Sequence, residues 1–264
     1  AGARPPAAAG SRVIVTLVGT GTLVPSARRS TPALALEGAG FQATVDGGTG
    51  TLRRQAELGI DFRRTGALLF THIHPDHTLD LLHFLFASKY TPGFRRSLPI
   101  RVLGPPGFGR FVEDLREGMR SWTDGWPAAL LVGVVEEGRP CALGPWSVAA
   151  HRLQHPAINF GYRVVSENGG ILAVTGDTAW CEALVDLCRG ADLLIAECSG
   201  DAAHPSEGHL TAPEVGRLAA LAGVKQLLLT HLYPLPDDRR RVHEAAELYP
   251  GPVLLASDGD RFLL

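Results

Sequence analysis

The chain has 264 residues, 45% of them hydrophobic, which is enough to bury the core of one large domain or two small ones. Its 25 Lys and Arg residues nearly balance its 27 Asp and Glu residues, and the formal net charge of -2 excludes the global basic field expected of a nucleic-acid-binding protein. No apolar run approaches the roughly 18 to 20 residues that a membrane-spanning helix requires. We therefore expect a soluble protein without a membrane partner.

The four cysteines are too sparse for a disulfide framework, and no two of them have CxxC spacing. This usage favours a reducing compartment, so we expect a cytoplasmic protein. Residues 1–11, which are rich in Ala, Pro and Gly, predict a flexible tail, and 12–264 predict a single domain. Because the chain starts at Ala1 and not at Met, a processed exported protein stays open as the alternative.

The first hundred residues alternate strand and helix signals. Short apolar runs that end in turn residues predict strands at 13–18 and 67–70 and a hairpin at 33–37 and 41–45. Helical patterns cover 51–58 and 79–88. The segment 71–77 therefore lies at a strand-to-helix turn, where side chains are well placed for chemistry.

Strand signals dominate the centre of the chain, after a predicted strand at 100–103 and a predicted helix at 108–119. The further candidate strands are 130–135, 147–153, 160–165 and 171–174. Strands and helices then alternate from Ala179 to the end. Two β-rich stretches, each followed by helices, predict two stacked sheets covered by helices on both outer faces.

Four metal-binding side chains lie within six residues in the run Thr71-His72-Ile73-His74-Pro75-Asp76-His77. In an extended turn, His72 and His74 point to the same side of the backbone, and Asp76 and His77 follow directly. Imidazole and carboxylate donors without cysteine favour a catalytic metal site over a closed structural zinc site. A surface turn that merely contains histidines is the alternative, and the density of donors disfavours it.

This run resembles the THxHxDH motif of metallo-β-lactamase-fold hydrolases, whose fold is an αββα sandwich of two mixed β-sheets flanked by helices. The further landmarks of that family match His155, Asp177 and His231, each where a predicted strand ends. The resemblance implies a dinuclear site. His72, His74 and His155 would hold one metal, Asp76, His77 and His231 the other, and Asp177 would bridge the two.

Three other segments resemble the branch that contains ribonuclease Z and its phosphodiesterase relatives. Residues 17–22, with Pro25 and two arginines after them, resemble its first strand and loop. Asp46, in the segment 45–50, would support a metal-binding histidine from behind. A turn residue at the end of a hairpin is the alternative for Asp46, and both roles can hold together.

The third segment, Gly208 to Thr211, resembles the His-x-Thr element of this branch. The resemblance implies that His209 contacts the phosphate and protonates the leaving oxygen. Thr211 and Glu214 also form a capping-box pattern at the start of a predicted helix, which explains the threonine without the histidine. An exposed turn histidine is thus the alternative for His209.

The connection between His155 and Asp177 bears on the substrate. Ribonuclease Z enzymes that process transfer RNA carry a long flexible arm between these landmarks, but this chain has room only for two strands and a turn at 167–170. Together with the near-neutral charge, the missing arm makes transfer RNA an improbable partner. We expect a small, anionic phosphodiester such as a cyclic nucleotide.

The expected mechanism uses two divalent metal ions, most simply Zn2+ with Mn2+ or Fe as alternatives, that share a bridging hydroxide. Asp76 would orient or deprotonate this nucleophile, and His209 would protonate the leaving group. Trp122 and Trp126, in an irregular segment, are candidates for stacking on the substrate. Packing of a surface loop or a homodimer interface would explain them equally well.

The same scaffold supports other activities, because a fold does not determine a reaction. An arylsulfatase, a lactonase, a β-lactamase-like hydrolase and a ribonuclease Z-type endoribonuclease are the alternative enzymes. A metal-bearing scaffold that only binds a partner is the alternative outside enzymes. His209 favours phosphodiesters, because a poor leaving group needs a general acid more than an activated ester does.

Overall fold

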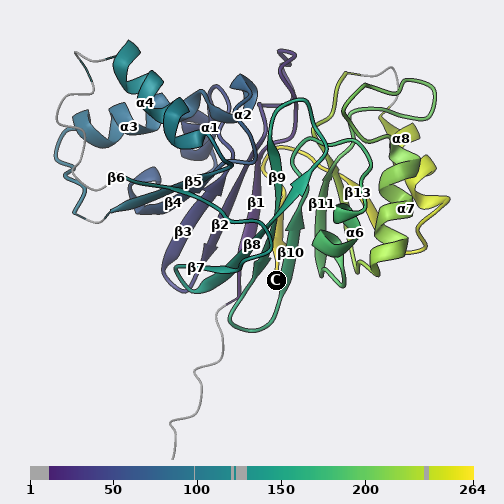
Figure 1. Cartoon of the computed structure of the whole chain (residues 1–264). Helices are drawn as coiled ribbons and strands as arrows, with labels where there is room; N and C mark the ends of the chain where they lie inside the picture. The colour runs from purple at the N-terminus through teal and green to yellow at the C-terminus, as the bar shows by residue number, and fades with distance from the viewer. Residues whose placement is uncertain (1–11, 98, 120–121, 123–129, 235–237) are drawn as a thin grey trace, which may run out of the picture.

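The computed structural model describes residues 12–97, 99–119, 122, 130–234 and 238–264. Two seven-stranded sheets face each other, and helices cover the outer side of each (Figure 1). This is the αββα sandwich of two mixed sheets that the sequence predicts.

The first sheet mixes antiparallel and parallel strands. Its order is β14-β1-β2-β3-β4-β5-β6, antiparallel from β14 to β3 and parallel from β3 to β6. The strands are β1 (Ile14–Gly19), β2 (Ala33–Gly38), β3 (Phe41–Val45), β4 (Thr65–Leu69), β5 (Ile100–Gly104), β6 (Leu130–Val134) and β14 (Arg261–Leu263). The predicted hairpin is present as β2 and β3, with Leu36 opposite Ala43.

The second sheet also has an antiparallel part and a parallel part. Its order is β13-β12-β11-β10-β9-β8-β7, antiparallel from β7 to β10 and parallel from β10 to β13. The strands are β7 (Cys141–Leu143), β8 (Trp146–Leu153), β9 (Asn159–Val165), β10 (Ile171–Val174), β11 (Leu193–Glu197), β12 (Leu227–Thr230) and β13 (Val253–Leu255). β9 and β10 form a hairpin whose turn is closed by a bond from Ser166 N–H to the Gly170 carbonyl, 2.9 Å.

Helices α1 to α4 cover the first sheet and α6 to α8 the second (Figure 1). They are α1 (Thr51–Glu57), α2 (Pro75–Thr78), α3 (Asp80–Tyr90), α4 (Phe108–Gly118), α6 (Ala183–Cys188), α7 (Ala212–Ala222) and α8 (Arg239–Ala246), with a short 3-10 helix at Phe62–Arg64. The long predicted helices are confirmed within a few residues. Within the described residues, no helix has the length and apolar character needed to cross a membrane.

The core lies between the two sheets and joins them into one body. Val15, Leu36, Val148 and Tyr162 are fully buried there, each from a different strand. The Tyr162 hydroxyl donates a hydrogen bond of 2.6 Å to the Phe70 carbonyl of the other sheet. Because Phe70 directly precedes the histidine run, this bond fixes the position of the run relative to the second sheet.

Candidate active site

The predicted metal ligands lie together at one edge of the facing sheets. The first sheet supplies His72 and His74 from the loop after β4, and Asp76 and His77 from α2. The loops after β8, β10 and β12 of the second sheet supply His155, Asp177 and His231. Two adjoining groups result, one of His72, His74, His155 and Asp177 and the other of Asp76, His77 and His231, and a third group of Asp177, His209 and His231 overlaps both. The first two have the composition that the resemblance implies, and the binding of a metal ion by each stays a prediction.

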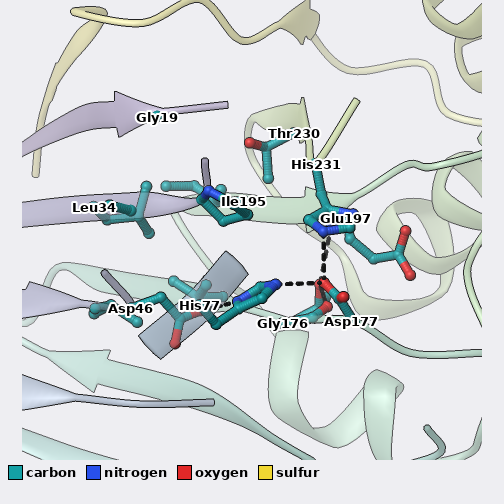
Figure 2. A pocket seen from close by; sticks show the side chains of 15 residues that line it. Gly19, Leu34, Asp46, His77, Gly176, Asp177, Ile195, Glu197, Thr230 and His231 are labelled. Carbon is teal, nitrogen blue, oxygen red and sulfur yellow. Dashed lines mark hydrogen bonds and ion pairs between the residues drawn. The ribbon is translucent and has the colours of Figure 1, made fainter. Parts of the chain in front are cut away.

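Asp177 lies between the two groups and turns one oxygen to each. Its Oδ2 is 3.7 Å from His72 Nε2, whereas its Oδ1 is 3.4 Å from His77 Nε2 and 3.3 Å from His231 Nε2. Figure 2 shows His77 and His231 both directed at this carboxylate. Asp76 Oδ2 closes the second group, 3.6 Å from His231 Nε2. Asp177 therefore has the position of a bridging ligand.

Contacts at Nδ1 direct the Nε2 atoms of three rings, those of His72, His77 and His155, toward the cluster, where His155 Nε2 lies 3.4 Å from His74 Nδ1. Asp46 Oδ2 accepts from His77 Nδ1 at 2.8 Å, and the Gly208 carbonyl accepts from His155 Nδ1 at 3.0 Å. His72 Nδ1 is 2.9 Å from the Thr71 hydroxyl, which donates to Asp46. Since an N–H at Nδ1 leaves a lone pair on Nε2, these contacts select the tautomer that a metal requires.

Backbone strain in the described chain coincides with this site. Asp46 (φ 57°) and His231 (φ 54°) are two of the three non-glycine residues in the left-handed region. Gly48 is required where the β3–α1 turn passes α2, because a Cβ there would be 1.8 Å from the Asp76 carbonyl oxygen. Strain of this kind persists where the surrounding structure fixes it, and it is typical of functional sites.

The electrostatics of the cluster favour a bound cation. Burial lowers the pKa of His72, so its ring is neutral and able to donate a lone pair. Burial also opposes charge on His77, but the Asp177 and Asp46 carboxylates outweigh it and raise its pKa well above the ordinary value. Two carboxylates around a buried ring therefore stabilise positive charge at this point, whether it is carried by a proton or by a metal ion.

Unpartnered atoms in the cluster show that the donor set fits metal ions. Among the described residues, the buried atoms without a hydrogen-bond partner include His72 Nε2, His77 Nε2, His231 Nε2 and Asp177 Oδ1. Buried polar atoms are nearly always satisfied, because burying one without a partner costs about 1–3 kcal/mol. All four atoms belong to the groups described above, and a divalent ion in each group would satisfy them.

His209 lies beside the ligands in a carboxylate-supported position. Its Nδ1 is 2.9 Å from Glu197 Oε1 and 3.2 Å from the Ser199 hydroxyl, which also lies 3.0 Å from His231 Nδ1. Burial lowers the pKa of His209, but the hydrogen bond to Glu197 and its charge raise it above the ordinary value overall. The bond at Nδ1 leaves Nε2 as the nitrogen available to a substrate.

Glu197 and Ser199 are the site residues that the sequence analysis missed. Glu197 is buried at the end of β11, and its oxygens also accept from the backbone N–H groups of Thr178, Ser199 and Leu210. A signal was present, because Glu197 is a lone carboxylate at the end of the apolar run 193–196, just as Asp177 follows the apolar strand β10. Its partner His209 is distant in sequence, so the contact itself left no local pattern.

Of the two tryptophans predicted to bind substrate, the structure describes Trp122. Trp122 is half exposed and packs near Phe86 of α3, with ring centroids 6.0 Å apart. Its carbonyl accepts a hydrogen bond from Lys89. Trp126 lies outside the described residues. A role for either residue in substrate binding stays a prediction.

Comparison with known proteins identifies the family. Residues 43–232, which include all seven predicted ligands, Asp46 and His209, match the β-lactamase superfamily domain. The chain belongs to the β-lactamase superfamily. A metallo-β-lactamase fold protein of this type, YhfI from Bacillus subtilis, superposes with a TM-score of 0.85 over 96% of this chain and 100% of that one, at 22% identity.

Two relatives add detail to the superfamily assignment. Ribonuclease Z of Mycolicibacterium gilvum is 30% identical over 243 residues, which cover 83% of this chain and 84% of that protein. An uncharacterized protein of Mycobacterium bovis is 31% identical over 201 residues, 70% of this chain and 68% of the other. The chain is thus a metallo-β-lactamase-fold hydrolase with ribonuclease Z-like relatives, and this fold implies divalent metal ions.

Proposed function

We propose that this protein is a dinuclear metal-dependent phosphodiesterase that hydrolyses small phosphodiesters. The observation that carries the proposal is the Glu197–His209 pair, with 2.9 Å between Oε1 and Nδ1, beside the bridging carboxylate of Asp177. Cleavage of a phosphodiester releases an alkoxide, and a proton delivered to it typically accelerates the reaction about 10²- to 10⁴-fold. An aryl sulfate, which releases a phenolate, has less need of such a residue.

The side chains divide the work between binding and proton transfer. Bound to the two ligand groups, divalent ions supply activation of water and neutralisation of charge on the phosphoryl oxygens. Asp76, whose Oδ2 lies 3.6 Å from His231 Nε2 in the second group, orients or deprotonates the attacking water. His209 carries its proton at Nε2 and transfers it to the departing oxygen. Glu197 keeps the ring oriented and favours the protonated form.

The ribonuclease Z relative supports a phosphodiester substrate, and the short β9–β10 connection supports a small one. A ribonuclease cleaves phosphodiesters, and the ribonuclease Z of Mycolicibacterium gilvum covers most of this chain. In this chain β9 and β10 are joined by a tight turn at 166–170, which leaves no room for an arm that would hold a folded RNA. A small diester therefore suits this site better than transfer RNA.

The second candidate is a ribonuclease Z-type endoribonuclease, and the same relative favours it. The decisive experiment compares zinc-reconstituted protein on bis(4-nitrophenyl) phosphate, cyclic nucleotides, a dinucleotide, an aryl sulfate, a lactone and a precursor transfer RNA. Asp177→Ala serves as the control for metal dependence. We expect hydrolysis of the small diesters with little activity on the sulfate or lactone. A preference for precursor transfer RNA would replace the proposal with the second candidate.

A further inference from the structure

A large cavity opens beside the metal ligands, on the side of Asp76. Its volume is about 530 Å³, and its walls come from the loop between β1 and β2, from the start of α1 and from α2. Asp76 belongs both to this wall and to the second ligand group. A molecule that fills the cavity therefore reaches the atoms at which hydrolysis takes place.

The loop that forms the outer wall is fixed before any ligand binds. Asp258 accepts hydrogen bonds from Thr20 N–H (3.0 Å), the Thr20 hydroxyl (2.7 Å) and Ser30 N–H (2.6 Å), so one carboxylate holds both ends of the loop. Gly21 N–H donates to the Ser30 carbonyl at 2.8 Å. A wall held in this way loses little conformational entropy when a ligand binds, which favours selective binding.

Two arginines line the cavity, and they differ in how far their guanidinium groups are engaged. Arg29 is 17% exposed, contacts Asp238 at 3.4 Å and also donates to the Thr20 hydroxyl and the Ala256 carbonyl. Arg53 is 79% exposed and contacts Glu57 at 3.4 Å, whereas its neighbour Arg54 contacts both Glu57 and Asp258. Arg53 is therefore the guanidinium in this wall that an anion in the cavity can reach.

Two leucines add an apolar surface to the same cavity. Leu23 is 63% exposed on the loop, and Leu79 is 47% exposed directly after α2. Leucine side chains exposed in a concave, charged site offer a surface for a flat ring, because covering them removes apolar area from water. The cavity therefore combines an apolar surface that a nucleoside ring can cover with a guanidinium group that an anion can contact.

We infer that this cavity binds the organic arm of a nucleotide-type diester whose arm bears a second anionic group. The ring covers Leu23 and Leu79, and the second anion contacts Arg53, while the scissile phosphate occupies the ligand cluster. This rests on the proposed phosphodiesterase function and sharpens it. A nucleotide with only one phosphate places that group at the ligands and leaves Arg53 to solvent.

The test uses two chromogenic substrates that differ by one phosphate: thymidine 5'-(4-nitrophenyl phosphate) and its 3'-phosphorylated form. The zinc-loaded protein should show the higher kcat/KM on the 3'-phosphorylated form. Arg53→Gln should reduce this preference about three- to fivefold, as expected for an exposed charge pair. Arg110→Gln is the matched control, because Arg110 is an exposed helix residue that also pairs with a carboxylate four residues on.

A second variant and a binding measurement keep the two proposals separable. Leu23→Glu adds a carboxylate to the wall and should lower kcat/KM for the 3'-phosphorylated substrate more than for the other. By calorimetry, thymidine 3',5'-bisphosphate should bind the zinc-loaded protein more tightly than thymidine 5'-monophosphate, and Arg53→Gln should remove the difference. If neither diester is hydrolysed but this binding pattern appears, the cavity assignment stands and the phosphodiesterase proposal falls. Equal binding of the two nucleotides, or a preference that both variants leave unchanged, would overturn the cavity assignment.

Discussion

Asp46 connects the backbone conformation to the metal chemistry at the level of a single residue. Its left-handed backbone places one oxygen on Thr71 N–H at 2.8 Å and the other on His77 Nδ1 at 2.8 Å. The geometry is compatible with both alternatives drawn from the sequence, since Asp46 follows β3 in a left-handed conformation and its carboxylate contacts the predicted ligand His77. The two roles use different oxygens of one carboxylate.

Asp46→Asn should weaken metal binding without unfolding the protein. Asparagine tolerates a left-handed backbone, but it replaces the charge that holds the His77 ring, and loss of such a partner typically costs about 10- to 100-fold in metal affinity. A zinc titration against a chelating dye measures the effect, with Asp61→Asn, at a distant 3-10 helix cap, as the control. An affinity equal to that of the wild type would show that Asp46 is only a turn residue.

Glu197→Gln should affect turnover in a way that depends on the leaving group. Without the carboxylate, His209 loses the partner that orients it and raises its pKa. The rate on a dinucleotide, which releases a poor leaving group, should fall about 10²-fold. The rate on bis(4-nitrophenyl) phosphate should change little, because nitrophenolate leaves without a proton.

Two comparisons separate this role from a general structural one. Glu207→Gln changes an exposed carboxylate of the same turn and should keep both rates. His209→Gln should reproduce the leaving-group dependence of Glu197→Gln. Equal losses on both substrates, with unchanged zinc content and melting temperature, would mean that the pair does not deliver a proton.

At the scale of elements, the segment before α7 contains one residue that caps the helix and another that contacts the candidate active site. Thr211 and Glu214 form the predicted pattern, and Thr211 N–H donates to the Glu214 carboxylate at 2.8 Å. His209, two residues earlier, contacts Glu197 and takes no part in the cap. The His-x-Thr segment therefore has a structural half and a half that faces the metal site.

Thr211→Ala should destabilise the protein by about 1 kcal/mol, the usual effect of removing a helix cap. Activity on the dinucleotide should stay close to that of the wild type, because the Glu197–His209 contact does not use the threonine. Urea denaturation measures the first quantity and steady-state kinetics the second. A large loss of activity at unchanged stability would assign Thr211 to the site itself.

Helices and strands were predictable from the sequence where a run of neighbouring residues carried a clear apolar pattern or turn residues. The apolar runs and turn residues located the β2–β3 hairpin and the long helices within a few residues. The single turn α2 is not predicted, because Pro75 to Thr78 is too short to show helical periodicity. The three-residue strand β7 was missed for the same reason.

At the scale of the whole molecule, the site joins the two halves of the sandwich. The first sheet supplies four of the predicted ligands and the second sheet three, so each metal group includes donors from both sheets. The resemblance of the motif residues to the metallo-β-lactamase pattern was the basis on which this arrangement was predicted. The Glu197–His209 contact and the cavity beside Asp76 were not predictable, because they depend on residues that only the fold brings together.

Removal of metal should therefore destabilise the entire protein. Ions that bind only the folded state at about 1,000 times Kd add about 4 kcal/mol, which shifts the melting temperature on the order of 10 °C in a domain of this size. Thermal melting with EDTA, and again after addition of zinc, measures the shift. Asp177→Asn should melt at nearly the same temperature with and without zinc, and a full zinc response in that variant would remove Asp177 from the ligand set.

The bonds from Asp258 to Thr20 and Ser30 link residues that are more than two hundred positions apart. The loop beside the predicted ligands is therefore positioned from the far end of the sequence. A substitution at Asp258 would release this wall of the cavity while every predicted metal ligand stays unchanged.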